Sequence, residues 1–191
     1  MSELEIPSWL NATLASDAAK GEGVMALAIR PLRLGQLVAA RATTVQIAEG
    51  DNLGIQAAIK EGPRGGPLLV AGGSPRGSRA VMGDIVATSL MRAGFTAFVS
   101  DGLVRDSREI VQLGLPVWCR GSCPVASTKD GPGGYVDEVE CGGITVRSGD
   151  LVIADDDGVV VWPSERIEEY LAAAEARLRS DRDRLAALRQ K

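Results

Sequence analysis

The sequence predicts a single α/β domain followed by a C-terminal helix. Between residues 68 and 119, short apolar runs typical of strands alternate with segments of helical periodicity, which favours an α/β layer with a partly parallel sheet. Residues 134–163 carry four further strand patterns separated by glycine and aspartate clusters. The chain has 191 residues, of which 45% are hydrophobic. A chain of this mass buries about 70% of its unfolded surface, which is enough for one domain with a full core.

The N-terminal third is expected to contain two helices and two strands. Residues 11–19 are rich in alanine and leucine and predict a helix. Either Ser8 or Asn11 could cap it. The alternating, β-branched run 36–48 predicts a long strand. The other two expected elements are a helix over 51–60 and a buried strand over 68–71.

The middle third repeats a strand–helix–strand rhythm. Apolar residues spaced close to the helical period predict a helix over 79–93, which Gly94 would end. The remaining predicted elements are a strand over 95–99, a short helix over 107–113 and a strand over 115–119.

The last third changes character at about residue 134. Its four short strand patterns are YVDEVE, ITVR, LVIA and VVVW. Gly142-Gly143 and Asp156-Asp157-Gly158 are typical of hairpin turns. We therefore expect a β-meander beside the α/β layer, which completes a domain over residues 1–163.

Residues 164–191 predict an amphipathic C-terminal helix. Ser164 is a suitable N-cap, and glutamates fill the first turn, where the helix dipole favours anions. The apolar residues form a narrow stripe, which consists of Ile167, Leu171, Ala174, Leu178, Leu185 and Leu188. So narrow a stripe favours packing at a subunit interface or across the domain.

Composition and charge exclude several classes of partner. The chain has 21 basic and 25 acidic residues, and it lacks the basic stripe that nucleic-acid binding requires. Its uncharged stretches are far shorter than a membrane span. The acidic N-terminus carries no apolar signal segment. The sequence therefore predicts a cytoplasmic protein that binds neither nucleic acid nor membrane.

The absence of histidine restricts the possible chemistry. It excludes imidazole bases, Ser-His-Asp and Cys-His pairs, and zinc held by histidine. Catalysis would use carboxylates, Arg, Lys, Tyr, Cys, backbone amides or a metal held by oxygen ligands. Cys119, Cys123 and Cys141 lack metal-site spacing, and we interpret them as small buried residues.

Two segments of the middle third could form a site for a small 2-oxo acid. Residues 83–86 (GDIV) lie in the first turns of the expected helix, where backbone amides and the helix dipole suit a carboxylate. Arg105 and Asp106 follow a strand and turn, on the edge where ligands of open α/β sheets bind. Arg105 would grip a carboxylate, and Asp106 would hold a hard divalent metal ion.

Simpler interpretations of these segments are also open. Arg105 and Asp106 after an Asp-Gly turn could be an ordinary surface turn with a helix cap, and Gly83 could serve packing alone. We interpret the acidic run 155–158 as a solvated hairpin turn rather than as a calcium loop.

Five motifs spread over residues 14–163 match a known protein family. They are Ile29-Arg30-Pro31-Leu32, Gly50-Asp51-Asn52, Met82-Gly83-Asp84, residues 100–106 (SDGLVRD) with Glu109, and residues 149–160 (GDLVIADDDGVV). The sequence here resembles the RraA-like family, which includes 4-hydroxy-4-methyl-2-oxoglutarate (HMG) and 4-carboxy-4-hydroxy-2-oxoadipate (CHA) aldolases. Gly83, followed after 21 residues by Arg-Asp-x-x-Glu, is the most specific part of the match.

The resemblance implies a role for each candidate site residue. The residues that match the family's pyruvate-holding loop are Gly83, Asp84, Ile85 and Val86, and their amides would contact the substrate carboxylate. The substrate-binding arginine falls on Arg105, and the ligand of a Mg²⁺ or Mn²⁺ ion falls on Asp106. Asp84 stands where many members carry glutamate, which could alter a contact to the metal through water.

The resemblance also implies a fold and an activity. The fold is a swivelling β/β/α sandwich, assembled as a homotrimer or as a hexamer of two trimers. The activity is that of a metal-dependent (class II) pyruvate aldolase, which cleaves 4-hydroxy-2-oxo acids such as HMG or CHA to pyruvate and a second oxo acid. Oxaloacetate decarboxylation is its companion reaction. A Schiff-base mechanism would need a buried lysine, and no lysine lies in the candidate segments.

Two other functions stay open. Some members of the family are non-enzymatic regulators that bind and inhibit ribonuclease E, and an acidic surface would suit a basic partner segment. Such regulators can lack the metal-binding aspartate, which is present here as Asp106. Methyltransferase activity is a weaker interpretation, because no glycine-rich nucleotide loop with a following acidic residue supports it.

Overall fold

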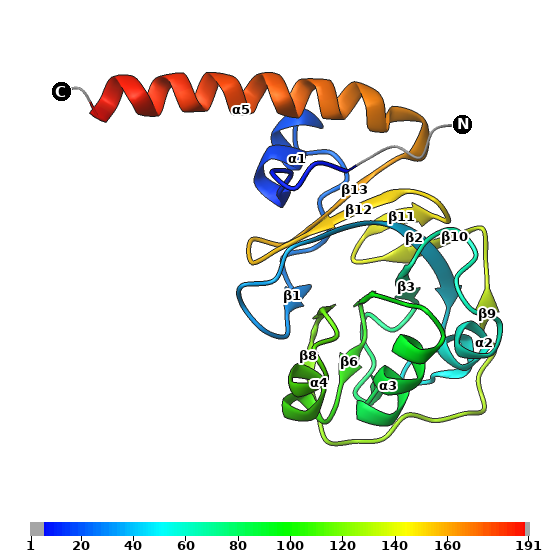
Figure 1. Ribbon diagram of the computed structural model, residues 1–191. Helices are drawn as coiled ribbons and strands as arrows, with labels where there is room; N and C mark the ends of the chain where they lie inside the picture. The colour runs from blue at the N-terminus through cyan, green and yellow to red at the C-terminus, as the bar shows by residue number, and fades with distance from the viewer. Residues whose placement is uncertain (1–5, 190–191) are drawn as a thin grey trace.

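The computed structural model, which describes residues 6–189, contains one mixed β-sheet with a layer on each face (Figure 1). In spatial order the strands are β1 (Arg30–Pro31), β7 (Val117–Cys119), β5 (Ala97–Ser100), β3 (Leu68–Gly72), β2 (Val38–Gln46), β12 (Leu151–Ala154) and β13 (Val159–Trp162), with β9 (Gly134–Tyr135) beside β2. Strands β2, β3, β5 and β7 are parallel, and the others pair antiparallel. The predicted α/β class is confirmed.

Three helices cover one face of this sheet: α2 (Leu53–Glu61), α3 (Asp84–Arg92) and α4 (Ser107–Leu113). Successive strand residues point to opposite faces. Leu69 and Phe98 therefore pack among the helix residues Ile55, Leu90 and Ile110. Burial of these side chains fixes the helices on the sheet. Each helix follows a strand and the loop after it.

A β-hairpin covers the opposite face of the sheet. Its strands are β10 (Glu138–Cys141) and β11 (Ile144–Arg147). Val139 and Val146 pack there against Leu68, Val70 and Trp118. Hairpin, sheet and helices together make the β/β/α sandwich that the resemblance implies, so this expectation is confirmed.

Residues 134–163 do not form a single meander. Strand β9 pairs with β2, the hairpin β10–β11 stands alone, and β12 and β13 extend the main sheet beside β2. The expectation of a meander beside the α/β layer is therefore wrong for β12 and β13. Strand patterns define the segments, but they do not specify which neighbour each segment pairs with.

A second, small parallel sheet consists of β4 (Ala80–Met82), β6 (Leu103–Val104) and β8 (Gly121–Ser122). The helix expected from residue 79 begins only at Asp84, because residues 80–82 form a buried strand instead. Segments of two or three residues are too short to carry a periodic pattern, so the sequence did not predict this sheet.

Two helices pack on the outer side of β12 and β13. Helix α1 (Ala12–Ala18) is capped by Asn11, whose side chain accepts a hydrogen bond from the Leu14 N–H at 2.8 Å. Helix α5 (Ile167–Arg189) follows a 3₁₀ turn, η1 (Ser164–Arg166), and its stripe residues Ile167 and Ala174 are buried against α1 and the sheet.

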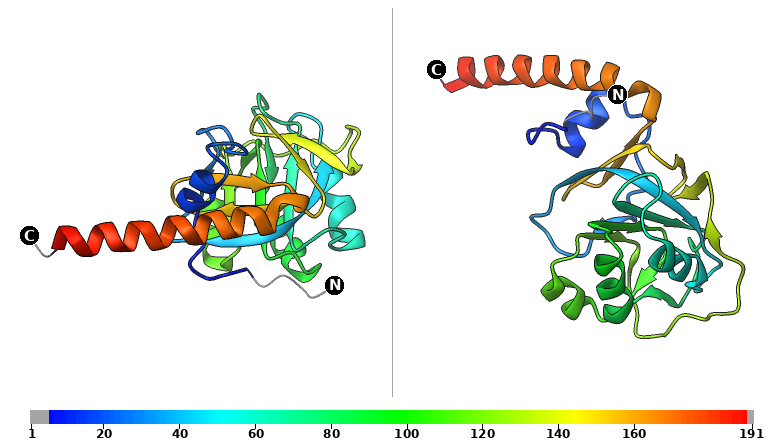
Figure 2. Two further views of the ribbon diagram at one scale, coloured as in Figure 1. Left: turned by 90° about the horizontal axis from the view of Figure 1, so that it is seen from above. Right: turned by 45° about the vertical axis from the view of Figure 1, so that its right-hand side comes forward.

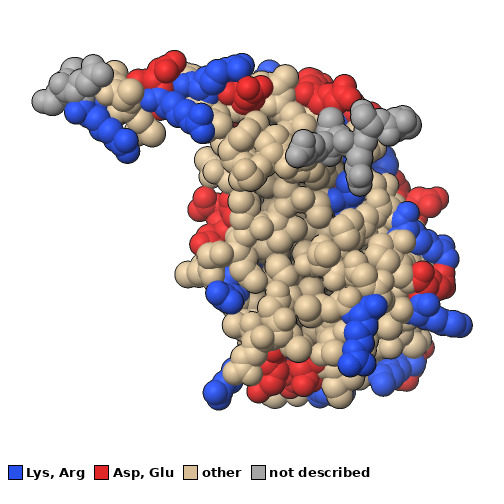
Figure 3. Space-filling model, viewed as in Figure 1, with Lys and Arg blue, Asp and Glu red and all other residues tan. Residues whose placement is uncertain are grey.

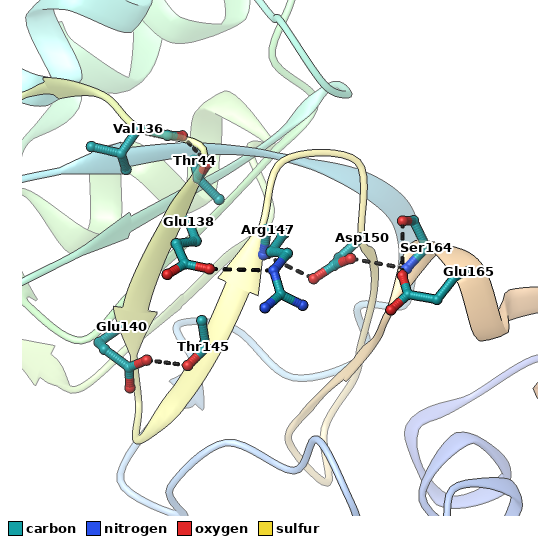
Figure 4. Close-up of polar contacts among 9 residues, drawn as sticks. All are labelled: Thr44, Val136, Glu138, Glu140, Thr145, Arg147, Asp150, Ser164 and Glu165. Atoms are coloured by element: carbon teal, nitrogen blue, oxygen red, sulfur yellow. Dashed lines mark hydrogen bonds and ion pairs between the residues drawn. The ribbon is translucent and has the colours of Figure 1, made fainter.

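Asp150 performs the capping role that the sequence assigned to Ser164 (Figure 4). Its carboxylate accepts the Ser164 N–H at 2.9 Å and the Arg147 N–H at 2.8 Å. Asp150 is only 3% exposed, and burial raises the pKa of its carboxyl group. Ser164 lies inside the 3₁₀ turn, so its prediction as N-cap is wrong. The cap comes instead from a residue 14 positions earlier.

The outer part of α5 projects beyond the domain (Figure 2). The stripe residues Leu185 and Leu188 lie there and are 52% and 67% exposed. Arginine side chains alternate with acidic ones along this projection (Figure 3). Among residues 6–189, no helix is both long enough and apolar enough to cross a membrane.

Candidate active site at the start of α3

Two parallel strands of the small sheet bring the candidate residues together. Strand β4 leads into Gly83 and α3, and β6 leads into Arg105 and Asp106 ahead of α4. Because the strands are parallel, the residues after each strand meet at the same edge. The backbone N–H of Arg105 donates to the carbonyl oxygen of Met82 at 2.9 Å and fixes this register.

Gly83 lies directly against Arg105 and Asp106. A Cβ atom added at Gly83 would come within 2.5 Å of Asp106 Oδ2 and 3.0 Å of Arg105 Nε. Asp106 itself has a φ of 54°, in the left-handed region. A residue other than glycine adopts this conformation at a cost of about 1–3 kcal/mol, and such residues cluster at functional sites.

The N-terminal end of α3 already holds two carboxylates. Asp106 Oδ2 lies 3.3 Å from Arg105 Nε and accepts the Asp84 N–H at 3.4 Å. Asp84 Oδ1 accepts the N–H of Ile85 at 2.7 Å. The predicted loop amides therefore do face anionic groups. A substrate carboxylate that used the Ile85 amide would replace the side chain of Asp84.

A cavity of about 410 Å³ opens beside this end of α3. Its lining residues are Asn52, Gln56, Ala80, Met82, Gly83, Asp84, Ile85, Val86, Ser89, Arg105, Ala126, Ser127 and Lys129. The predicted residues 83–86 and Arg105 thus share one cavity wall, and Asp106 contacts Gly83 and Arg105 from behind it. The side chains of Arg105 and Asp106 are 39% and 35% exposed, so the approach of a small anion is open.

Some residues singled out by the sequence do not line the cavity. Glu109 is exposed on α4. The glycine-rich segment 71–73 is separated from α3 by β4. Asp101 instead holds that segment: its carboxylate accepts the Ser74 N–H at 2.9 Å, and burial raises its pKa.

The sequence missed the other side of the cavity. Asn52 is the N-cap of α2, Gln56 lies on α2, and Ser127 and Lys129 lie on the loop after β8. Asn52 was part of a matched motif but carried no assigned role. Lys129 lines the cavity although no lysine falls in the predicted segments, because the long loop 123–133 folds back over α2. Its exposure does not provide the burial that a Schiff-base lysine needs.

Cysteine chemistry is not supported at this site. Cys119 and Cys141 are buried in the core, as expected, whereas Cys123 is only partly buried. Burial raises the pKa of the Cys119 thiol to about 11, so the reactive thiolate is scarce at neutral pH.

A comparison with protein families identifies the family. The RraA-like model, described as Aldolase/RraA, matches residues 12–161. This chain belongs to the RraA-like family. A curated relative from Halalkalibacterium halodurans, named "Putative 4-hydroxy-4-methyl-2-oxoglutarate aldolase", is 37% identical over 184 residues, which cover 93% of this chain and 87% of the relative.

Solved RraA-like structures share the fold. RraAS2 of Streptomyces coelicolor, described as an unusual member of the RNase ES inhibitor RraA family, superimposes with a TM-score of 0.76 at 27% identity, covering 94% of this chain and 93% of RraAS2. A Geobacillus kaustophilus protein named as an S-adenosylmethionine: 2-dimethylmenaquinone methyltransferase has a TM-score of 0.70 at 30% identity, covering 80% and 94%. Proteins that share this fold thus have different functional names.

Proposed function

We propose that this RraA-like protein is a divalent-metal-dependent pyruvate aldolase that cleaves 4-hydroxy-2-oxo acids such as HMG or CHA. The observation that carries the proposal is the contact of Gly83 with both Arg105 and Asp106 beside a cavity at a helix N-terminus. The name of the Halalkalibacterium halodurans relative supports the same class of reaction. Oxaloacetate decarboxylation would accompany it, because loss of CO₂ leaves the same pyruvate enolate.

The cavity residues match the charge that the reaction develops. In the cleavage, the C4 hydroxyl gives its proton to solvent and becomes a carbonyl as the C3–C4 bond breaks. The electron pair of that bond becomes the enolate of pyruvate, which then takes up a proton at C3. Amides at the start of α3 would hold the C1 carboxylate. The guanidinium of Arg105 would stabilise the negative charge on the C2 oxygen, which is greater in the transition state than in the substrate.

A divalent cation fits the donor set at Asp106. Among residues 6–189 there is no cluster of three His, Cys, Asp or Glu side chains that could enclose a metal. Mg²⁺ and Mn²⁺ are commonly held by one or two carboxylates together with water and substrate oxygens. Asp106 would supply one such carboxylate; Asp84 donates its backbone N–H to it, and the Asp84 carboxylate is a second candidate ligand. When bound, the cation would act as a Lewis acid on the 2-oxo group.

Regulation of ribonuclease E is the alternative function. The similarity to RraAS2, described as an unusual member of the RNase ES inhibitor RraA protein family, favours it. The presence of Asp106 beside Arg105, which lines an accessible cavity, favours the aldolase, because protein binding alone needs neither group.

The deciding measurement is pyruvate release from HMG, CHA and oxaloacetate with Mg²⁺ and then with EDTA. We compare the wild type with Asp106→Asn, because asparagine also tolerates a positive φ and removes only the charge. We expect metal-dependent release, reduced about 100-fold or more in the variant. Asp183→Asn, on the exposed face of α5, is the matched control. No turnover of any substrate by the folded, metal-loaded wild type would contradict the aldolase.

We further infer that the outer part of α5 packs against a second copy of this chain in a homo-oligomer. Leu185 and Leu188 continue the stripe that packs on α1, but they extend beyond the domain. Residues 175–189 carry five arginines and three carboxylates, whereas the whole chain has more acidic than basic residues. The body of another copy is therefore complementary in charge to this basic projection.

A further inference from the structure

A second hollow lies beside α1, outside the candidate active site. It has a volume of about 210 Å³ and lies between α1 and the turn that joins β12 to β13. Figure 1 shows this turn pointing to the same side as the outer end of α5. We call it the α1 hollow, and its lining residues are Ala12, Thr13, Ser16 and Asp17 of α1, Val24, and residues 157–160. None of them lines the cavity beside α3, so the proposed aldolase reaction gives the α1 hollow no role.

Hydrogen bonds hold the two walls of the α1 hollow together. Asp155 Oδ2 accepts the Ala12 N–H at 2.8 Å, at the start of α1. Asp157 Oδ2 accepts the Thr13 hydroxyl at 3.1 Å. The two valines of residues 159–160 are 1% and 2% exposed and give the hollow an apolar floor. The hollow is therefore formed before a partner binds, which lowers the entropic cost of binding.

The surroundings of the α1 hollow are acidic. Residues 12–19 and 155–158 contain four carboxylates and no lysine or arginine. The three consecutive aspartates at 155–157 form no ion pair within the part of the chain that the structure describes. Figure 3 shows acidic side chains on the body beneath the projecting part of α5. The cavity beside α3 differs, because its lining includes two cations and one carboxylate. The α1 hollow therefore suits a basic partner segment.

The outer part of α5 has the complementary chemistry. Residues 182–189 are all exposed, and they contain three arginines, one aspartate and two leucines. The leucines, Leu185 and Leu188, are 52% and 67% exposed. They would supply apolar side chains for the floor of the hollow, and the arginines would supply positive charge for its acidic surroundings.

Helix α5 already makes this pair of contacts once, with α1 of its own copy. Leu178 packs on the apolar cluster that α1 shares with the sheet, and Arg177 pairs with Asp17 at 3.2 Å. Arg184 and Leu185 repeat this pair seven residues later. A step of seven residues is about two helical turns, so the repeat lies on the same face of α5. Because it lies beyond α1 of its own copy, only another copy could offer it the same surface.

We propose that the α1 hollow of one copy receives the outer part of α5 from a second copy. Leu185 and Leu188 would lie over the hollow, and the arginines of residues 182–189 would face the carboxylates of residues 155–157. This inference rests on the packing of α5 against a second copy proposed above, and it names the surface that receives the helix. The two surfaces are different parts of the chain, so each copy can give one such contact and receive one.

The molar mass in solution tests the receiving surface. The acceptor variant, Thr13→Arg/Asp157→Arg, places two cations at the α1 hollow, and both side chains are exposed, so the domain should stay folded. We expect it to have the mass of a single chain at a micromolar concentration at which the wild type is assembled. Thr145→Arg/Asp137→Arg makes the same change of charge at the β10–β11 hairpin and should keep the wild-type mass. Light scattering measures the mass, and circular dichroism verifies the fold. If the acceptor variant unfolds, Ser16→Trp, which fills the hollow without a charge, replaces it.

Mixing two defective variants tests the direct contact. The acceptor variant keeps an intact α5, and the helix variant, Leu185→Glu/Leu188→Glu, keeps an intact α1 hollow. Neither should assemble alone, but together they retain one intact contact. We therefore expect fluorescence anisotropy to show that the labelled acceptor variant binds the helix variant with a micromolar Kd. A chain that carries both sets of substitutions has neither surface and should bind neither variant.

The outcomes separate this inference from the proposals on which it rests. A helix variant that dissociates while the acceptor variant keeps the wild-type mass would overturn the α1 hollow as the receiving surface and keep α5 in the assembly. Two variants that dissociate alone and do not bind each other would overturn the direct contact. A monomeric wild type would overturn both the contact and the packing of α5 on a second copy. The aldolase proposal is judged separately, by the release of pyruvate.

Discussion

Gly83 allows the start of α3 to approach Arg105 and Asp106 closely. Its own φ of −130° is open to any residue, so the requirement for glycine comes from space and not from backbone conformation. The atoms in the way are the Oδ2 of Asp106 and the Nε of Arg105. Both are side-chain atoms, so a methyl group at Gly83 would displace the proposed catalytic groups rather than the fold.

We therefore expect Gly83→Ala to impair activity more than stability. The variant should lower kcat/KM for pyruvate release by about 10–100-fold, because misplacement of catalytic groups by about 1 Å can cost that much. Gly134→Ala is the control, since a Cβ there meets no atom within 4 Å. Steady-state kinetics and thermal unfolding of both variants check this. Unchanged kinetics in Gly83→Ala would show that Arg105 and Asp106 do not need this geometry.

At this scale the sequence predicted one side of the cavity and missed the other. Residues 83–86, Arg105 and Asp106 were found because two short motifs, each at the end of an element, carry types of residue that bind anions and metals. Asn52 and Lys129 are separated from them in sequence: Lys129 belongs to no motif, and Asn52 belongs to a matched motif that assigned it no role. They reach the cavity through α2 and the hydrogen bonds of Asp51, which are tertiary contacts without a local sequence pattern.

At the scale of elements, Asp51 joins the start of α2 to the loop after β8. Burial pushes the pKa of Asp51 upward, but hydrogen bonds from Leu53, Gly131, Asp130 and Thr128 outweigh burial and hold the pKa below its usual value of 3.8. A carboxyl group whose pKa is lower in the folded state than in the unfolded chain stabilises the fold, and this contribution is fully present at pH values above the unfolded-state pKa. This contribution is lost as the pH falls through the folded-state pKa.

The expected result for Asp51→Asn is a loss of stability that depends on pH. At pH 7 the variant should lose about 2 kcal/mol of unfolding free energy, the size of a hydrogen bond to a charged group. Below pH 3.8 the difference from wild type should shrink, because the wild-type carboxyl becomes protonated as well. Urea unfolding at pH 7, 5 and 3 measures this, with Asp183→Asn as control. A difference that stays constant with pH would contradict the account.

Element boundaries were predictable where local signals were strong. The cap at Asn11 and the strand over 38–46 agree with the sequence, because side-chain capping and β-branched alternation act within a few residues. The start of α5 differed because Asp150, in the turn before β12, caps the 3₁₀ turn that leads into α5. The small sheet β4–β6–β8 could not be predicted, since each strand is fixed by its partners rather than by its own two or three residues.

At the scale of the whole molecule, α5 has more apolar surface than one copy can bury. Its inner part, including Ile167, Tyr170 and Ala174, packs on α1 and Trp162. Residues 182–189 are all exposed, although Leu185 and Leu188 continue the same stripe. An exposed apolar stripe on a projecting helix that also carries alternating charges is typical of a helix that packs against another chain.

We expect the double variant Leu185→Glu/Leu188→Glu to lower the molar mass in solution without unfolding the domain. The two side chains are exposed in a single copy, so their loss removes only contacts between copies. Each buried leucine contributes about 1.5–3 kcal/mol, so two changes repeated at every interface should dissociate the assembly at micromolar concentration. Ser180→Glu/Ala187→Glu adds the same charge on another face of α5 and should leave the mass unchanged. Light scattering coupled to gel filtration measures the mass, and circular dichroism verifies the fold. A wild type that is monomeric, or a leucine variant with the mass of the wild type, would contradict a role for α5 in assembly.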